Sequence, residues 1–301
     1  MTYRELDDLS TRLANGIICQ GIRTGSIIVV LIEKSLWVPV AQIAVMKCGC
    51  ASTVLDAGLP LQRHQSISKL VQPAAILTSP GYADHARELC LGSVQFILSY
   101  HSSQHWPAAS PVTLPTVDPS AWLYIVFTSG SMGIPKGVVI AHANCIGAVL
   151  NQQERLDFRE FDRVFDFASY AFDASWWNLI HSLTIRGCLC IPSDDEPKGD
   201  LPRALREYQV NYAILTPSVA WFRASELPAI LRTIHFGGEP RKVAVVKELS
   251  TRSTINAYGP AECPTVSTAL VTNPGDCNDS TIGIGTGLGT CTWIVKLDGS
   301  G

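Results

Sequence analysis

Short apolar segments alternate with helix-like segments along most of the chain, and this alternation limits the folds open to it. Ile27–Ile32 is a run of six apolar residues, mostly β-branched, with no polar residue among them. Such a run is typical of a strand covered on both faces, as in a parallel sheet. A helix-like stretch at Val38–Met46 and a strand-like one at Ala51–Leu55 follow, and the alternation resumes at Arg163–Phe167. This pattern predicts a doubly wound α/β fold.

The composition excludes several classes of protein. With 301 residues, 47% of them hydrophobic and 16% charged, the chain has room for about two domains and can bury a large core. The formal net charge is -3 and the basic residues form no block, so we expect no nucleic-acid partner. The longest apolar runs have six residues, far fewer than the roughly 20 that span a bilayer, and no signal core is present. We therefore expect no membrane contact. The ten cysteines include no Cys-x-x-Cys pair, so we expect a cytoplasmic chain with reduced thiols.

The stretch Tyr124–Gly137 is typical of a loop that binds an anion. An apolar strand runs into three hydroxyl residues, three glycines and one lysine, namely Thr128, Ser129, Gly130, Ser131, Gly133, Lys136 and Gly137. Glycines let backbone N–H groups approach phosphate oxygens, hydroxyls donate to them, and lysine adds a positive charge. The spacing differs from that of a Walker A loop, because no Ser or Thr follows Lys136. An ordinary Gly/Ser hairpin turn would explain the glycines but not the whole string.

Asp173 stands among aromatic residues, between Phe172 and the pair Trp176-Trp177. A carboxylate in such surroundings is costly unless a cation or hydrogen-bond donors compensate it, and the α-ammonium group of an amino acid is such a cation. The alternative is a helix-capping Asp, and both roles can hold at once. Farther along, Asn256–Glu262 follows a β-branched strand, which places it at the edge where open α/β sheets bind ligands.

Together these segments resemble the adenylate-forming superfamily, and within it the adenylation domains of nonribosomal peptide synthetases. Tyr124–Gly137 is similar to the phosphate loop of that superfamily. Four further segments resemble other family motifs in the expected order: Thr2–Leu6; Met46–Cys50 with Leu55, Asp56 and Pro60; Phe172–Ser175; and Asn256–Glu262. Five ordered motifs are far more specific than any one of them.

The resemblance implies a role for each matching residue. Thr128, Lys136 and Glu262 would be catalytic, with Glu262 as the ligand of Mg²⁺. ATP would be bound by Thr128, Ser129, Gly130, Ser131, Gly133, Lys136, Gly237, Gly238, Glu239, Asn256, Ala257, Tyr258 and Gly259. The amino-acid pocket would be lined by Asp173, Ala174, Trp177, Val219, His235, Gly237, Ala257, Thr265 and Val266. Because several of these residues are small and others apolar, we expect an aromatic or large apolar amino acid.

The implied activity is ATP-dependent activation of an amino acid as an aminoacyl adenylate for nonribosomal peptide synthesis. The partners would be carrier-protein and condensation domains of a larger synthetase, with phosphopantetheine only on the separate carrier. Two alternatives remain: an acyl- or aryl-CoA ligase of the same superfamily, which Asp173 disfavours, and a truncated remnant that binds nucleotide without turnover. Two departures bear on the second, Met132 in the phosphate loop and Ala261 in the last motif. Since the family's later motifs are missing, we expect weak activity from the isolated chain.

The resemblance also implies a division of the chain. Residues 26–155 would form a first α/β subdomain, and residues 1–25 with 156–272 a second, with the active site between them. Residues 273–301 would begin a distorted β-barrel, and the small C-terminal domain would be absent. The first helix has a cap of its own, because Glu5 stands three residues after Thr2 in the arrangement of a capping box.

Overall fold

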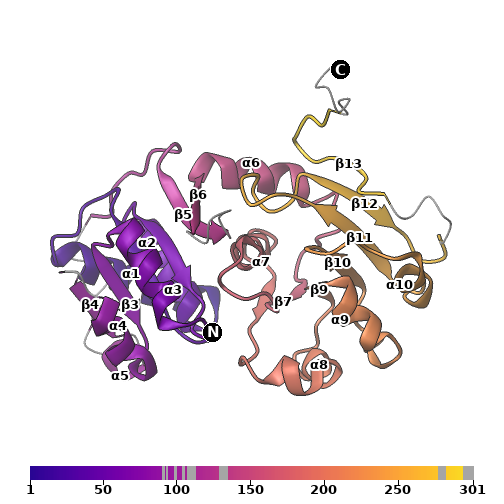
Figure 1. Ribbon diagram of the computed structural model, residues 1–301, viewed down its shortest axis with the longest axis horizontal. Coiled ribbons are helices and arrows are strands. Elements are labelled where there is room, and N and C mark those ends of the chain that lie inside the picture. Colours follow the sequence, from indigo (N-terminus) through magenta and orange to yellow (C-terminus); the bar gives the residue numbers. More distant parts are fainter. Residues whose placement is uncertain are drawn as a thin grey trace. The chain divides into compact units, whose positions relative to one another are not determined.

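The computed structural model describes residues 1–89, 92, 94–97, 100–103, 106, 113–128, 135–276 and 283–293 (Figure 1). The chain divides into two compact units. Unit 1 comprises Met1–Asn144 with Ser169–Asp173, and unit 2 comprises Cys145–Ala168 with Ala174–Gly301. Each unit contains one sheet and its own helices, which confirms the predicted α/β fold. Within the described ranges, no helix has the length and apolar character needed to cross a membrane.

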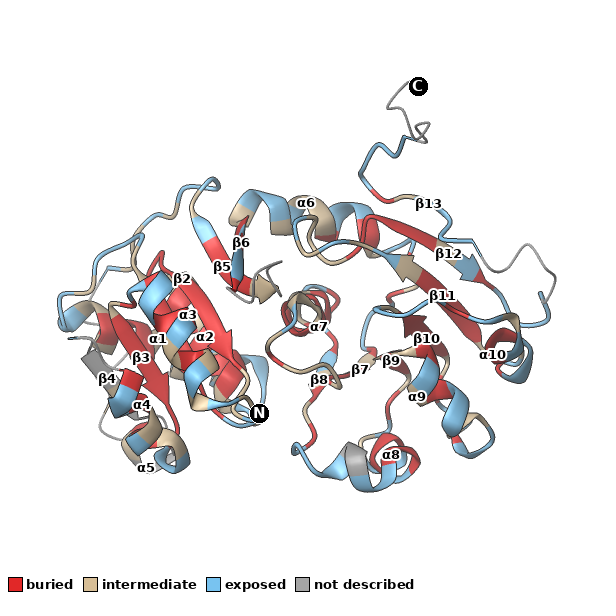
Figure 2. Ribbon diagram, viewed as in Figure 1, coloured by how far each residue is buried: buried red, intermediate tan, exposed pale blue. Residues whose placement is uncertain are grey.

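Unit 1 is built on a six-stranded sheet with the order β4-β3-β1-β2-β5-β6. Its strands are β1 (Ile27–Leu31), β2 (Ala51–Leu55), β3 (Ala75–Thr78), β4 (Val94–Ile97), β5 (Trp122–Thr128) and β6 (Lys136–Ala141). Neighbours run parallel except β5 and β6, which form an antiparallel pair. The central strand β1 is buried along nearly its whole length, as its unbroken apolar run predicts, and its neighbours β2 and β3 are buried along theirs (Figure 2).

The helices of unit 1 are α1 (Tyr3–Cys19), α2 (Trp37–Lys47), α3 (Leu61–Val71), α4 (Ala83–Leu89) and α5 (Tyr100–Ser103), with a 3₁₀ turn at Pro80–Tyr82. The predicted capping box is present in α1, where the Glu5 N–H donates to Thr2 Oγ1 and the Thr2 N–H donates to the Glu5 carboxylate. Leu13 and Ile17 pack with residues of α2 and β1 in one core cluster. The prediction that residues 1–25 join the second subdomain is therefore wrong, because the apolar stripe of α1 is buried against α2.

Unit 2 is built on a seven-stranded sheet with the order β13-β12-β11-β10-β9-β7-β8. Its strands are β7 (Arg163–Phe165), β8 (Cys188–Cys190), β9 (Tyr212–Leu215), β10 (Thr233–Phe236), β11 (Ser253–Tyr258), β12 (Thr268–Thr272) and β13 (Thr286–Gly287). Strands β7 to β11 pair in parallel, whereas β12 and β13 are antiparallel additions. The family resemblance predicts that the segment 273–301 begins a β-barrel. Its described strand β13 pairs with β12 at the end of the unit 2 sheet, and the β-barrel itself stays a prediction.

The helices associated with unit 2 are α6 (His142–Gln152), α7 (Asp173–Thr184), α8 (Glu196–Glu207), α9 (Pro217–Phe222) and α10 (Val243–Glu248), with a 3₁₀ turn at Ala224–Glu226. The core of this unit has two parts. One gathers around Phe165, Leu205 and Phe236, and the other around Trp177 and Tyr212. The second part contains Trp177 and Val266 of the predicted amino-acid pocket, with Ala257 packed against it, so it positions these residues.

Candidate functional site

The predicted phosphate loop leaves and re-enters the sheet of unit 1 at a single point. Thr128, the last residue of β5, pairs with Lys136, the first residue of β6. Gly137 follows, and a Cβ placed there would come within 3.2 Å of the Phe127 ring, so a glycine lets the ring cover the backbone. Thr128 and Lys136 therefore hold both ends of the loop. The other predicted residues of this loop, Ser129, Gly130, Ser131, Met132 and Gly133, lie outside the described residues.

The segment that leads into Asp173 is anchored in unit 1. Ser169 Oγ donates to the Asp56 carboxylate, directly after β2. Asp56 Oδ1 also accepts the Gly58 N–H at 2.9 Å. The Tyr170 ring is buried in the same core cluster as Ile28, with Lys34 Nζ 5.1 Å from its centroid. These contacts fix the path of the chain up to the start of α7.

Sequence reasoning missed two histidines near Asp56: His64 contacts the Asp56 backbone, and His85 contacts His64. His64 Nε2 lies 2.9 Å from the Asp56 carbonyl oxygen, and His64 Nδ1 lies 3.0 Å from His85 Nε2. Because a carbonyl only accepts, His64 must donate from Nε2 and accept at Nδ1. Burial lowers the pKa of His64 and so favours this neutral form. The pair has no metal-ligand spacing in the sequence, so only the tertiary structure could bring it to notice.

Asp173 is the first residue of α7 and is partly exposed. A carboxylate in the first turn is stabilised by the helix macrodipole, so the capping alternative and the ligand-binding role are compatible. Ala174 follows it, and Trp177 stands one turn farther along the same helix.

The predicted pocket residues of unit 2 gather around Trp177. The indole ring meets the ring of His235 edge-on, with centroids 4.9 Å apart. Val266 and Ala257 belong to the same cluster as Trp177. Burial lowers the pKa of His235 to about 3, so its imidazole is neutral. Val219 lies on α9 and packs with the other core cluster.

The predicted adenine-binding residues lie at the carboxyl ends of two neighbouring strands. Phe236, the last residue of β10, pairs with Asn256 of β11, so the segments Gly237–Glu239 and Ala257–Gly259 leave the same edge of the sheet. Tyr258 is 55% exposed, as a ring that stacks on a ligand requires. Two polar side chains already have partners. Asn256 Nδ2 donates to the Gly283 carbonyl at 2.8 Å, and the Glu239 carboxylate accepts the Ser218 hydroxyl at 2.6 Å.

The loop that follows Tyr258 is unusually tight. A Cβ on Gly259 would stand 2.2 Å from the Thr265 carbonyl oxygen, and Thr265 itself has a φ of 56°. The Ser267 N–H donates to the Tyr258 carbonyl at 2.9 Å and closes the loop. Glu262 is exposed within it. Among the described residues, no group of three or more His, Cys, Asp or Glu side chains could hold a metal ion. A single exposed carboxylate still suits Mg²⁺, which takes its other ligands from phosphates and water.

Another residue that sequence reasoning missed is Gln152, the last residue of α6. Its side chain contacts both Trp177 and the backbone of the loop that contains Thr265. No motif marks it, because its two partners lie 25 and 114 residues away in the sequence.

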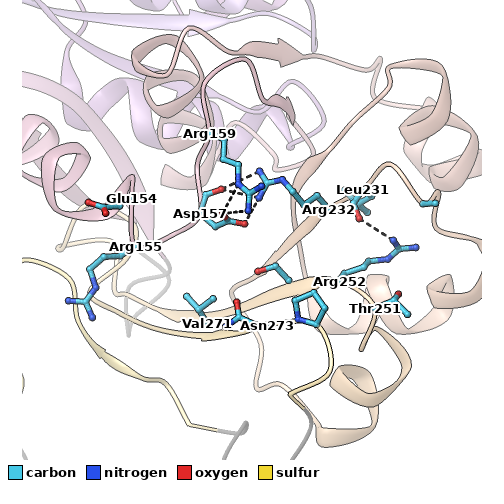
Figure 3. Close-up of a pocket in the computed structure, with 13 residues that line it drawn as sticks. Glu154, Arg155, Asp157, Arg159, Leu231, Arg232, Thr251, Arg252, Val271 and Asn273 are labelled. Atoms are coloured by element: carbon cyan, nitrogen blue, oxygen red, sulfur yellow. Dashed lines mark hydrogen bonds and ion pairs between the residues drawn. The ribbon is translucent and has the colours of Figure 1, made fainter.

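A large cavity of unit 2 lies away from all these residues. It has a volume of about 460 Å³ and is lined by Asp157, Arg232, Arg252, Val271 and neighbouring side chains (Figure 3). Arg232 precedes β10 and Ser253 begins β11, so this cavity lies at the amino-terminal edge of the strands. Within it, Arg232 donates to Asp162 at 2.8 Å and to Asp157. None of the predicted site residues lines it.

The predicted residues are distributed over both units. Thr128, Lys136 and Asp173 belong to unit 1. The other predicted residues for which the structure gives a position belong to unit 2: Ala174, Trp177, Val219, His235, Gly237, Gly238, Glu239, Asn256, Ala257, Tyr258, Gly259, Glu262, Thr265 and Val266. Within unit 2 the structure brings the predicted pocket residues Trp177 and His235 into contact and places the predicted adenine-binding segments side by side.

Comparison with known proteins agrees with this geometry. The family profile described as AMP-binding enzyme matches residues 1–300. The nonribosomal peptide synthetase ungA of Aspergillus violaceofuscus is 42% identical over 300 residues, which cover 98% of this chain and 3% of that protein. This chain thus spans only a small part of that relative.

Solved structures share the fold. The nonribosomal peptide synthetase FmoA3, bound to α-methyl-L-serine-AMP, superposes with a TM-score of 0.84 at 21% identity, over 96% of this chain and 33% of that one. The N-terminal subdomain of Klebsiella oxytoca NpsA, in complex with 3-hydroxybenzoyl-AMSN, gives a TM-score of 0.80 at 20% identity, over 96% of this chain and 74% of that one. The chain belongs to the AMP-binding enzyme family and is homologous to the adenylation regions of fungal nonribosomal peptide synthetases.

Proposed function

We propose that this chain activates an amino acid as its aminoacyl adenylate, at the expense of ATP, for nonribosomal peptide synthesis. The observation that carries the proposal is the placement of Asp173. Its carboxylate stands at the start of α7, one turn before the buried indole of Trp177, in a segment anchored by Ser169 and Tyr170. A carboxylate at the start of the helix that carries the buried indole suits a ligand with an ammonium group next to an apolar side chain. The 42% identity to a nonribosomal peptide synthetase supports the same function.

The reaction is a nucleophilic substitution at phosphorus. A carboxylate oxygen of the amino acid attacks the α-phosphorus of ATP, a new O–P bond forms, and the bond to the leaving pyrophosphate breaks. The residues of the protein position the reactants and offset charge, without a covalent intermediate on the enzyme. Lys136 and Thr128, at the two ends of the loop, would contact the phosphates. Glu262 would hold Mg²⁺, which supplies positive charge to the phosphate oxygens.

The contacts of Trp177 support an apolar substrate side chain. The only polar atom of its indole, Nε1, donates to Gln152 at 2.8 Å, so the ring offers a substrate only apolar surface. His235 is neutral, because burial lowers its pKa to about 3. Ala174, Gly237 and Ala257 are small. We therefore propose an aromatic or large apolar amino acid as the substrate.

We also propose that a phosphopantetheine thiol on a separate carrier domain attacks the carbonyl carbon of the adenylate, so that a thioester forms and AMP leaves, and that a condensation domain acts next. The name of the relative ungA supports this assignment, although the chain spans only 3% of that protein. The protein of which this chain is part would then supply one building block of a peptide.

Amino-acid-dependent exchange of pyrophosphate into ATP tests the proposal. The 301-residue chain is assayed with each of the twenty proteinogenic amino acids, and binding of the matching 5′-O-(N-aminoacyl)sulfamoyl adenosines is measured by calorimetry. We expect aromatic or large apolar amino acids to give the strongest signal in either assay. A preference for acidic amino acids would contradict the pocket assignment. Tighter binding of an acyl analogue that lacks the amino group would point instead to an acyl- or aryl-CoA ligase.

A further inference from the structure

We infer that Gln152 is a positioning residue of the amino-acid pocket, which holds the Trp177 indole and the Pro264–Val266 backbone in register. The inference rests on the proposed function, because these two elements supply Trp177, Thr265 and Val266 to the proposed pocket. It concerns unit 2 alone. Gln152 itself would not touch the substrate.

The side chain of Gln152 uses both ends of its amide. Its Oε1 atom accepts the Trp177 Nε1–H at 2.8 Å, and its Nε2 donates to the Val266 carbonyl at 2.7 Å and to the Pro264 carbonyl at 3.2 Å. An indole N–H only donates and a carbonyl only accepts, so one orientation of the amide satisfies all three bonds. The residue is 2% exposed. A buried amide with every bond made orders the groups around it.

The indole of Trp177 is confined on its other sides by rings. The rings of Phe158, His181 and His235 lie with their centroids 4.9, 4.5 and 4.9 Å from that of Trp177. These contacts confine the ring, but none of them bonds its polar Nε1–H. The bond to Gln152 is therefore the contact that sets the rotation of the indole, and with it the face turned toward a ligand.

The backbone of the Pro264–Val266 segment also depends on the Gln152 amide as a hydrogen-bond donor. Thr265 sits between the two carbonyls that Gln152 contacts, and its φ of 56° is one that a β-branched residue rarely adopts. Such a conformation persists only where the surroundings hold it. The two hydrogen bonds from Gln152 Nε2 to the carbonyls on either side of Thr265 hold Thr265 in this conformation. Without them, the buried Val266 carbonyl would lose this donor, the Pro264 carbonyl would keep the Val266 N–H, and the loop could relax away from Trp177.

Of the residues assigned to the nucleotide, those next to β10 and β6 lie outside these contacts, whereas Gly259 packs against the Thr265 carbonyl and Glu262 lies in the same loop. Gly237 and Gly238 follow β10, and Lys136 begins β6 in the other unit. None of them is hydrogen-bonded to Gln152 among the described contacts. A change at Gln152 should therefore weaken recognition of the amino acid much more than recognition of the nucleotide. A residue with only a structural role would weaken both.

Two probes separate these effects in the 301-residue chain. The first is 5′-O-(N-L-phenylalanyl)sulfamoyl adenosine, with the L-leucyl form in parallel. The second is 5′-O-sulfamoyl adenosine, which lacks the aminoacyl group. The ratio of their dissociation constants, measured by calorimetry, reports the amino-acid pocket alone.

Gln152→Met keeps the length of the side chain and removes all three hydrogen bonds. We expect it to weaken the aminoacyl probe about tenfold, the equivalent of one to two buried hydrogen bonds, with the second probe unchanged within about twofold. Gln152→Glu keeps the acceptor for Trp177 but sets a buried carboxyl group against the two carbonyl oxygens, so its loss should be at least as large in the same direction. Gln153→Met is the matched control, since Gln153 contacts Thr184 at the exposed side of the helix and should change neither constant.

Trp177→Phe supplies an independent variant should Gln152→Met fail to fold. It removes the same hydrogen bond from the other side, and combined with Gln152→Glu it should lose less than the sum of the single losses. Equal weakening of both probes by Gln152→Met would reduce Gln152 to a structural residue, and unchanged binding of both would refute any role. If the wild-type chain gains no affinity from the aminoacyl group, the proposed function fails and this inference with it. If the wild type gains affinity and the variants keep it, the inference alone fails.

Discussion

Thr128 and Lys136 are direct partners in the antiparallel pair of β5 and β6, with the predicted phosphate loop as the only chain between them. Their side chains thus project from the same face of the strand pair, where the loop begins and ends. The carboxyl end of the parallel strand β2 lies at the same edge of this sheet, since β2 pairs with β5. A hydroxyl and an ammonium group held side by side at such an edge suit a phosphate group.

Replacing Lys136 tests this arrangement. We expect Lys136→Met to weaken ATP about tenfold or more, because a charge-assisted hydrogen bond to phosphate is lost. Calorimetric titration with ATP in the absence of amino acid measures the effect. Lys69→Met, an exposed lysine on α3 of the same unit, is the control and should bind ATP as the wild type does. Equal affinity in both variants would remove Lys136 from the nucleotide site.

Asp173 should discriminate between ligands with and without an amino group. In Asp173→Asn we expect binding of the phenylalanyl sulfamoyl adenosine to fall about tenfold or more, because the ammonium group loses its counter-charge. The corresponding 3-phenylpropanoyl probe, which has no amine, should bind the variant as well as the wild type or better. Parallel losses for the two probes would show that Asp173 only caps α7.

The stability of unit 2 should depend on pH through its buried histidines. Burial lowers the pKa of His181 and that of His235 to about 3, from an ordinary value of 6.5. The folded state therefore keeps both rings neutral, while the unfolded state takes up protons below pH 6.5. Stability should be constant above that pH and fall by roughly 1.4 kcal/mol per pH unit for each histidine as the pH drops toward 3.

Urea denaturation at several pH values between 7 and 4 measures this loss. His181→Phe keeps a ring stacked on Phe158, 4.6 Å away in the wild type, and removes one titrating group. The free energy of unfolding should then fall less steeply with decreasing pH than in the wild type. Identical slopes for the two proteins would mean that His181 is not kept neutral by the fold.

The tight loop after Tyr258 should not tolerate a side chain at Gly259. Gly259→Ala would bring a Cβ within 2.2 Å of the Thr265 carbonyl oxygen, so we expect a loss of at least about 2 kcal/mol in stability. Gly147→Ala is the matched control, because its Cβ meets no atom within 4 Å in the helix α6. That variant should gain about 0.5–1 kcal/mol from better helix propensity. Thermal unfolding of both variants decides the matter, and a neutral Gly259→Ala would show that the loop can open.

Local sequence patterns predicted much of the fold. The apolar runs at Ile27–Ile32 and Ala51–Leu55 became the central strands β1 and β2. Thr2 and Glu5 formed the capping box that their spacing indicates. The polar stretch around Asp200 reads as a loop because it contains Pro and Gly, yet it lies within α8, where Asp200 departs from helical geometry. Leu201 and Leu205, which follow in the same helix, are buried in the core. Their burial outweighs the poor helix propensity of the polar stretch.

The amino-acid sequence by itself determined most of the strands and helices, and which residues begin and end the predicted phosphate loop, because hydrophobic period, capping and turn chemistry act over a few residues. Only the tertiary structure decided that α1 packs on α2, that Asp56 receives Ser169, and that Gln152 joins Trp177 to Val266. Those contacts link residues 25 to 114 positions apart. They depend on how complete elements pack against one another, and no pattern within a short window carries that information.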